Sequence, residues 1–132
     1  MAEYDKKAVL QPSSAPTVED CIEAKGDRKE LLRLSAQATK TLAYMNTQKA
    51  RLLSFEDALE PRRDMLLSRA VSEANTSGYT YHDLRMAEAR QSKQYQTANR
   101  DLIRTRSRRR MVESVIRNME QLLNQIDRTL SN

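Results

Sequence analysis

The sequence contains very little glycine, proline and aromatic side chain, and these shortages exclude several architectures. Its 132 residues include two glycines, three prolines, one phenylalanine and no tryptophan. Sheets depend on turn residues and on β-branched or aromatic strands, so this composition is hard to reconcile with a sheet. Phosphate-binding and dinucleotide-binding loops need several closely spaced glycines, which the chain lacks. The abundant Ala, Leu, Arg, Glu and Gln are helix formers, and they predict an all-α fold.

Cysteine, histidine and long apolar runs are scarce as well. A single Cys21 allows no internal disulfide, which is typical of a reducing compartment. No apolar run reaches membrane-spanning length and no signal sequence opens the chain. We therefore expect a soluble cytoplasmic protein without membrane contact, in the host cytoplasm if the chain is phage-encoded. Cys21 and His82 are too few for a metal site or a thiol catalyst, and we expect no cofactor and no enzymatic activity.

A short tail precedes the helical part of the chain. Residues 1–16 end in a Pro-Ser-Ser-Ala-Pro segment that resists regular structure, so they are predicted to be flexible. Residues 17–132 are predicted to form a single helical domain. A 15 kDa chain of this composition buries little apolar area per residue, which makes oligomerisation a natural source of stability.

Two helix starts are visible in the first half of that domain. Thr17 and Asp20 have capping-box spacing and predict a short helix over 18–25 that Gly26 ends. The same spacing recurs ten residues later in Asp27 and Glu30.

The helix predicted from Asp27 and Glu30 runs to about Leu59. Apolar residues recur on it every seven positions and define one face: Leu31, Ala38, Met45, Leu52 and Leu59. Pro61 then breaks or kinks the helix, because proline disfavours helical geometry in the preceding residue. Residues 62–74 are helical in pattern again, and residues 75–78 form a turn.

The last helix is predicted to extend from Thr80 to Leu130, about 50 residues and ~75 Å if unbroken. Apolar residues alternate at spacings of four and three in its C-terminal third: Val112, Ile116, Met119, Leu123, Ile126 and Leu130. Two such heptad faces predict long amphipathic helices packed as a hairpin or a coiled-coil-like bundle.

The positive charge is concentrated in this last helix. Residues 1–66 hold 11 basic and 11 acidic side chains, whereas residues 67–132 hold 12 basic and 7 acidic, which leaves the net charge of +5. The window 100–110 contains six arginines and one acid, Asp101. A focused cationic patch indicates a polyanionic partner, either nucleic acid or an acidic protein surface. The alternative is a solvated face with ion pairs to neighbouring acids.

Helical geometry distributes these arginines around the axis. Arg100, Arg104 and Arg108 are expected along one side, and Arg106 and Arg110 on the far side. A further arginine, at position 109, projects close to the apolar face. Because burying an unpaired guanidinium is costly, we expect either that the helix packing opens here or that an anion enters it.

Two segments carry a resemblance to a known family. Lys49-Ala50-Arg51-Leu52 is similar to the KARL tetrapeptide of the UvsY recombination mediators of T-even phages. Residues 97–104 resemble that family's small–Ala–polar–basic–Asp–apolar–apolar–basic stretch, and an apolar-periodic tail follows through Leu123 and Ile126.

The resemblance implies a homo-oligomeric helical ring that binds single-stranded DNA. It further implies two protein partners, a single-strand-binding protein and a RecA-like recombinase that the ring helps to load. With the arginine cluster, it gives the candidate DNA-binding residues: Lys49, Arg51, Arg100, Arg104, Arg106, Arg108, Arg109 and Arg110. Two alternatives remain open, a helical adaptor whose arginines bind an acidic protein and a helical protein that coats duplex DNA or RNA.

Overall fold

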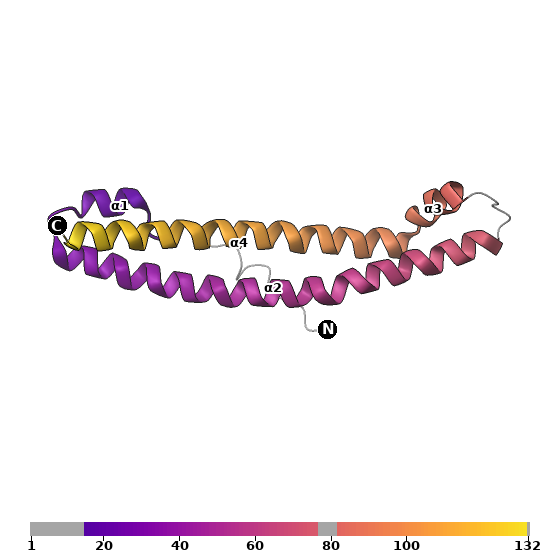
Figure 1. Ribbon diagram of the computed structural model, residues 1–132, viewed down its shortest axis with the longest axis horizontal. Coiled ribbons are helices and arrows are strands. Elements are labelled where there is room, and N and C mark those ends of the chain that lie inside the picture. The colour runs from indigo at the N-terminus through magenta and orange to yellow at the C-terminus, as the bar shows by residue number, and fades with distance from the viewer. Residues whose placement is uncertain (1–14, 77–81, 132) are drawn as a thin grey trace. The chain divides into compact units, whose positions relative to one another are not determined.

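The computed structural model describes residues 15–76 and 82–131, except for the side chains of 74–76 and 82–83. Four helices account for most of these residues: α1 (Val18–Glu23), α2 (Arg28–Thr76), α3 (His82–Arg90) and α4 (Lys93–Ser131) (Figure 1). The described part of the chain contains no strand, so the all-α prediction is confirmed. None of its helices has an apolar stretch of the length that a bilayer crossing requires.

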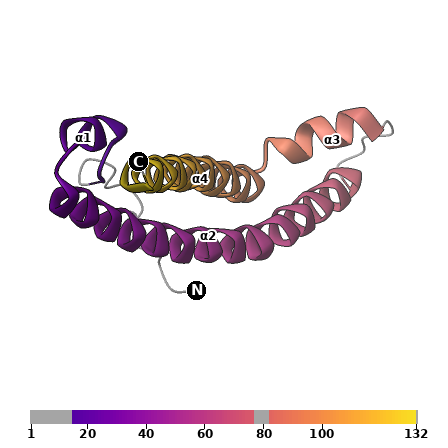
Figure 2. The same ribbon diagram turned by 60° about the vertical axis from the view of Figure 1, so that its left-hand side comes forward.

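The contacts of the chain divide it into two compact units. Unit 1 consists of Met1–Arg51 and Arg108–Asn132, and unit 2 consists of Leu52–Ser107. In unit 1, α1 lies beside the C-terminal part of α4 and the N-terminal part of α2 in both views (Figures 1 and 2). The start of α2 packs on the end of α4, so these two segments run antiparallel, as in a helical hairpin.

The predicted cap of α1 is confirmed in full. The Asp20 amide donates to the Thr17 hydroxyl at 3.2 Å, and the Thr17 amide donates to the Asp20 carboxylate at 2.8 Å. After the helix, Gly26 adopts a φ of 93°, a left-handed conformation that a residue with a Cβ rarely takes.

The cap of α2 forms in a simpler way than the capping-box spacing predicts. The Glu30 amide donates to Asp27 Oδ1 at 3.1 Å, so Asp27 caps the helix. The Glu30 carboxylate instead accepts from the Arg33 guanidinium, one turn further along.

The prediction that the first long helix ends near Leu59 is wrong, because α2 continues through Pro61 to Thr76. Proline lacks the N–H that would donate to the carbonyl of Asp57, at a cost of about 3 kcal/mol in a helix interior. Pro61 and Asp57 are both exposed, so water can solvate that carbonyl. Leu59 is buried just before the proline, and half-buried apolar residues follow it, so packing on both sides offsets the cost.

The predicted single helix from Thr80 to Leu130 is interrupted. Amides of Gln91 and Ser92 donate to carbonyls three residues back, at 2.9 and 3.1 Å, which tightens the end of α3. Ser92 then occupies the N-cap position of α4, and its carbonyl accepts from Gln96 at 2.9 Å. Serine is among the preferred N-cap residues, so the sequence did contain a signal for this break.

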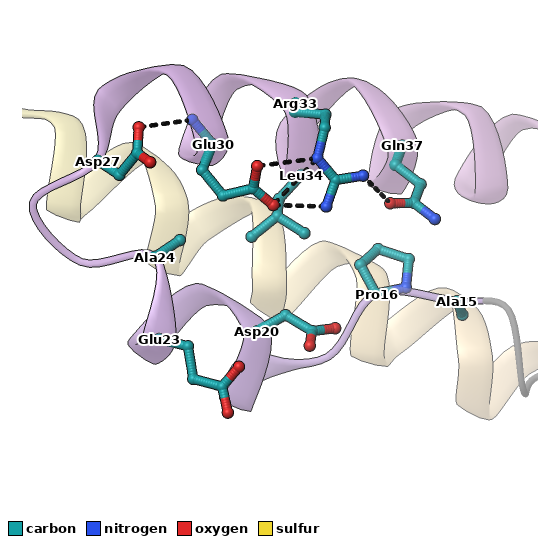
Figure 3. Close-up of a pocket in the computed structure, with 10 residues that line it drawn as sticks. All are labelled: Ala15, Pro16, Asp20, Glu23, Ala24, Asp27, Glu30, Arg33, Leu34 and Gln37. Atoms are coloured by element: carbon teal, nitrogen blue, oxygen red, sulfur yellow. Dashed lines mark hydrogen bonds and ion pairs between the residues drawn. The ribbon is translucent and has the colours of Figure 1, made fainter.

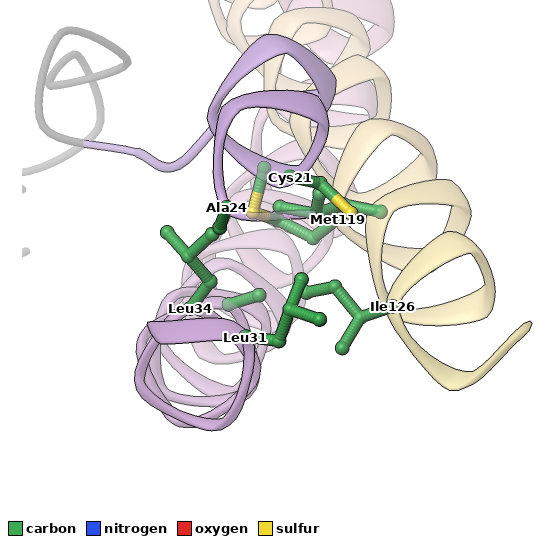
Figure 4. Close-up of a cluster of buried hydrophobic side chains, with 8 residues drawn as sticks. Cys21, Ala24, Leu31, Leu34, Met119 and Ile126 are labelled. Carbon is green, nitrogen blue, oxygen red and sulfur yellow. The ribbon is translucent and has the colours of Figure 1, made fainter. Parts of the chain in front are cut away.

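The core of unit 1 joins three helices. Side chains from α1, α2 and α4 converge in one cluster (Figure 4). Its buried members are Cys21, Ala24, Leu31, Leu34, Ala38, Met119, Leu122 and Ile126. Only a cysteine and an alanine enter it from α1, so this short helix approaches the other two closely. Cys21 therefore acts as a small apolar side chain in this core.

The predicted heptad face of α2 is confirmed at every position, from Leu31 at 2% exposure to Leu59 at 7%. On α4 two predicted positions, Leu123 and Leu130, are only partly buried at the edge of the core. Leu122 is instead fully buried at 0% exposure. At ~100° per residue Leu122 lies ~60° to one side of Met119 and Leu123 ~40° to the other, so spacing alone does not decide which leucine is buried; the side on which α4 packs in unit 1 does.

Unit 2 has a smaller set of buried apolar residues. They come from three helices: Leu52, Leu59, Ala89, Ala98 and Leu102. Two of the five are alanines, so this unit buries less apolar volume than unit 1 does.

Several predictions fall partly outside the described residues. The predicted tail 1–16 lies there except for Ala15, which packs against the core of unit 1, and Pro16, which is buried. The turn predicted at 75–78 is described only for Asn75 and Thr76, which belong to α2.

We expect Leu122→Ala to lower the free energy of unfolding by about 3 kcal/mol, because it opens a cavity in a fully buried site. Leu123→Ala is the matched control and should cost about 1 kcal/mol or less, since that side chain already contacts solvent. Urea unfolding followed by circular dichroism measures both variants. Equal losses would contradict the rotation of α4 that buries Leu122 in unit 1.

Candidate nucleic-acid interface

The six clustered arginines of α4 divide into an exposed group and a half-buried group. Arg100, Arg104 and Arg110 are exposed. The other three are half-buried: Arg106, Arg108 and Arg109. The buried side of α4 in this region is marked by Leu102, Thr105 and Val112. Arginines at a small angle from that side are half-buried, and those at a larger angle are exposed.

Arg106 reaches towards α2. Its Nη2 is 3.5 Å from Glu60 Oε2 in unit 2, with 32% of the arginine side chain exposed. Arg106 directly follows the buried Thr105, which places it ~100° to one side of the packed face. That angle lets a long side chain reach the neighbouring helix.

Arg109 occupies a heptad position of α4, in agreement with the prediction that it projects close to the apolar face. Its Nη1 is 2.5 Å from Glu113 Oε1, one turn further along, and both side chains are about one quarter exposed. The hydrogen bond from Arg109 holds the pKa of Glu113 below its usual value of 4.5, and the charges of Arg109, Lys49 and Arg117 add to this effect. The cation required a partner at this position, and the chain supplies a carboxylate.

Lys49 and Arg51 lie on different sides of α2, as predicted, but Lys49 is not at the centre of the packed face. That place belongs to Gln48, which is 4% exposed, while Lys49 is half-buried beside it. Lys49 is close enough to Glu113 to lower its pKa. In unit 1 the structure therefore brings Lys49 and Arg109 around one carboxylate.

Arg51 is exposed and stands apart from that group. Among the described residues, neither Arg51 nor Lys49 forms an ion pair. Arg100 and Arg104 belong to unit 2.

The sequence predictions missed three buried polar residues. They are Gln48, Glu56 and Thr105, at 4%, 8% and 4% exposure. Each follows a buried heptad residue by three or four positions, so the spacing alone was sufficient to find them. The Thr105 hydroxyl donates to the Asp101 carbonyl at 2.8 Å, which satisfies it inside its own helix.

A second missed feature is the charge of α2. Residues 31–55 contain no aspartate or glutamate, and they carry four basic side chains: Arg33, Lys40, Lys49 and Arg51. The balance of 11 basic and 11 acidic residues over 1–66 hides this segment, because the acids gather before residue 31 and after residue 55.

Four of the acids that precede residue 31 line a pocket at the α1 end of unit 1 (Figure 3). The pocket has a volume of about 460 Å³, and Asp20, Glu23, Asp27 and Glu30 contribute carboxylates to its wall. Glu30 is paired with Arg33, whose Nη1 also donates to Gln37 at 3.5 Å. No group of three or more side chains within the described residues has the arrangement to hold a metal ion.

Comparison with known proteins gives this chain no relative. No family model, no curated protein and no solved structure matches it.

We expect Glu113→Gln to lower the melting temperature more at pH 7 than at pH 3. A carboxyl group whose folded pKa is lowered contributes stability above its unfolded pKa, and this contribution disappears as the pH falls through the folded value. The measurement is thermal unfolding of both proteins at the two pH values. Glu120→Gln, an exposed change on the same helix, serves as the control. A deficit of the Glu113 variant that persists undiminished at pH 3 would contradict the role of the ionised pair.

Proposed function

We propose that this protein is a non-enzymatic single-stranded-DNA-binding protein that acts as a recombination mediator. The observation that carries the proposal is the separation of charge along the chain. Four acids of unit 1 line the pocket at α1, while residues 31–55 of α2 are free of acids. A surface with one sign of charge attracts a polyanion, and each neutralised phosphate releases a counterion.

The exposed arginines of α4 add to this surface. Arg100, Arg104 and Arg110 are exposed, and among the described residues none of the three forms an ion pair. Arg106 and Arg109 are bound to carboxylates and would contribute less to phosphate binding.

The mediator role rests on the resemblance of 49–52 and 97–126 to the UvsY proteins. In that role the protein would bind strands covered by a single-strand-binding protein and help to load a RecA-like recombinase. Any nucleotide hydrolysis would belong to the recombinase. Several weak phosphate contacts on one assembly multiply into a high avidity, which would allow it to compete for covered strands.

We also propose that copies of the chain assemble into a ring. In unit 1 the apolar faces of α2 and α4 are already packed on each other within one chain. Contacts between copies would therefore use exposed apolar side chains such as Val18, Ile22 and Leu32, which are 45%, 63% and 49% exposed.

A second function has one observation in its favour. Arg106 and Arg109 already bind the carboxylates of Glu60 and Glu113, which is the contact that an acidic protein partner would offer. In this alternative the protein is a helical adaptor, and its exposed arginines recognise acidic side chains instead of phosphates.

We expect the protein to bind a labelled oligo(dT) more tightly than a duplex of equal length, with an affinity that falls steeply as salt increases. Fluorescence anisotropy over a range of salt concentrations measures this difference. Failure to bind single strands at low salt would overturn the proposed function and favour the adaptor. A preference for the duplex would favour a duplex-coating protein.

We expect the double variant Lys49→Ala/Arg51→Ala to bind oligo(dT) more weakly and with a smaller salt dependence. Two lost phosphate contacts reduce the slope of log K against log salt by about 1.4. Lys25→Ala/Arg128→Ala removes the same charge from exposed positions at the α1 end of unit 1 and should leave the slope nearly unchanged. Identical slopes for the two double variants would contradict the assignment of Lys49 and Arg51.

We expect the wild type and both double variants to form the same oligomer, because neither double variant changes Val18, Ile22 or Leu32. Light scattering coupled to size-exclusion chromatography gives the mass directly. A stable monomer at micromolar concentration would contradict the ring.

A further inference from the structure

A line of long polar and aromatic side chains follows one side of α2 in unit 1. Lys40, Tyr44, Thr47 and Arg51 are separated by four, three and four residues, the spacing that keeps side chains on one face of a helix. All four are exposed. We call them the basic-aromatic stripe.

The stripe borders the packed face of α2 without entering it. Tyr44 and Arg51 directly precede the buried Met45 and Leu52, so each is ~100° around the axis from the core. Their backbone positions are thus fixed by the packing of the helix, while their side chains point towards solvent. A rigid helix holds the stripe in one arrangement before any ligand arrives, which lowers the entropic cost of binding.

The charge that α2 itself carries around the stripe is entirely positive. It lies within the acid-free residues 31–55. Among the described residues, Lys40 and Arg51 form no ion pair, so no carboxylate has to be displaced from them. By contrast Arg33, which precedes the stripe on the same helix, is bound to Glu30. The cations of the stripe are therefore the part of α2 best suited to bind phosphates.

Tyr44 supplies a contact that phosphate binding alone does not. It is 42% exposed, whereas Phe55 and Tyr95, the other aromatic side chains among the described residues, are half-buried. Its neighbours along the helix surface include Lys40, one turn before, and Thr47, whose hydroxyl donates to the Ala43 carbonyl at 3.1 Å. Stacking on an aromatic ring needs an unpaired base, so this contact favours a single strand over a duplex.

The spacing of the stripe residues along the helix axis suits a strand that contacts a cation, the Tyr44 ring and a second cation in turn. Lys40 precedes Tyr44 by ~6 Å along the helix axis, and Arg51 follows Tyr44 by ~10.5 Å. A strand that runs along α2 would thus meet a cation on each side of the ring.

We propose that the basic-aromatic stripe is the track for a single strand in unit 1, with Tyr44 stacked on a base and Lys40 and Arg51 bound to the flanking phosphates. The inference rests on the proposed function and deepens it. It identifies the residue that distinguishes a single strand from a duplex, and it adds Lys40 and Tyr44 to the candidate site.

The decisive variant is Tyr44→Ala. It should weaken binding to oligo(dT) about tenfold, because one base loses its stacking partner. Binding to an abasic oligonucleotide of the same length, and to duplex DNA, should stay within twofold, since neither presents an unpaired base to the ring. Tyr44→Phe should retain the oligo(dT) affinity. Leu53→Ala is the matched control, a loss of similar exposed apolar area on the same acid-free segment, and should have no effect.

A spectroscopic test complements the affinities. The chain has no tryptophan, so Tyr44→Trp places a single indole in the stripe. Its fluorescence should be quenched when oligo(dT) binds, and should not change with the abasic strand. A Leu53→Trp protein should show no quenching with either. This comparison does not depend on a loss of binding and is insensitive to small changes in stability.

The outcomes separate the inference from the function on which it rests. If the wild type does not bind oligo(dT) at low salt, both the proposed function and the stripe are overturned. If the wild type binds but Tyr44→Ala binds equally well, or the indole at position 44 is not quenched, the stripe alone is overturned. A tenfold loss that also appears with the abasic strand would equally exclude stacking by Tyr44.

Discussion

The antiparallel packing of the first part of α2 on the last part of α4 is the interaction on which unit 1 depends. Leucine, alanine and methionine make up most of the buried apolar residues, with valine and isoleucine added on α4, since the chain contains one phenylalanine and no tryptophan. α1 adds only Cys21 and Ala24 to the same core. Because so few residues are available, each buried position matters, and the choice of Leu122 over Leu123 decides the rotation of α4 in this unit.

The polar residues on these helices are arranged by the same packing. Gln48 and Thr105 take positions at which a heptad would place an apolar residue, and Arg109 meets Glu113 where the apolar face of α4 is interrupted. Such interruptions reduce the apolar area that is buried, but they restrict the registers that two helices can adopt. Lys49 lies close to the same glutamate. One of the two residues identified by the KARL resemblance thus belongs to the packed side of α2, whereas Arg51 belongs to its surface.

The six arginines at positions 100–110 do not form one uniform cationic surface. Two of them bind acids of the chain, and three are exposed at larger angles from the packed face. Net charge is therefore a poor measure of the surface that a polyanion would meet. The acid-free segment of α2, whose charge is cancelled in any count over half the chain, is the clearer cationic feature of unit 1.

The sequence by itself determined the helical class, the caps at Thr17 and Asp27, the left-handed Gly26 that follows α1 and the buried heptad of α2. These depend on contacts between residues a few positions apart, which spacing and side-chain chemistry specify. Only the tertiary structure decided that α2 continues through Pro61, that Gln48 and not Lys49 is buried, and that Arg106 turns towards Glu60. Each of these depends on what a second helix offers at that level. A lone helix gives no reason to prefer one rotation about its axis, and it cannot indicate which cation will find a carboxylate.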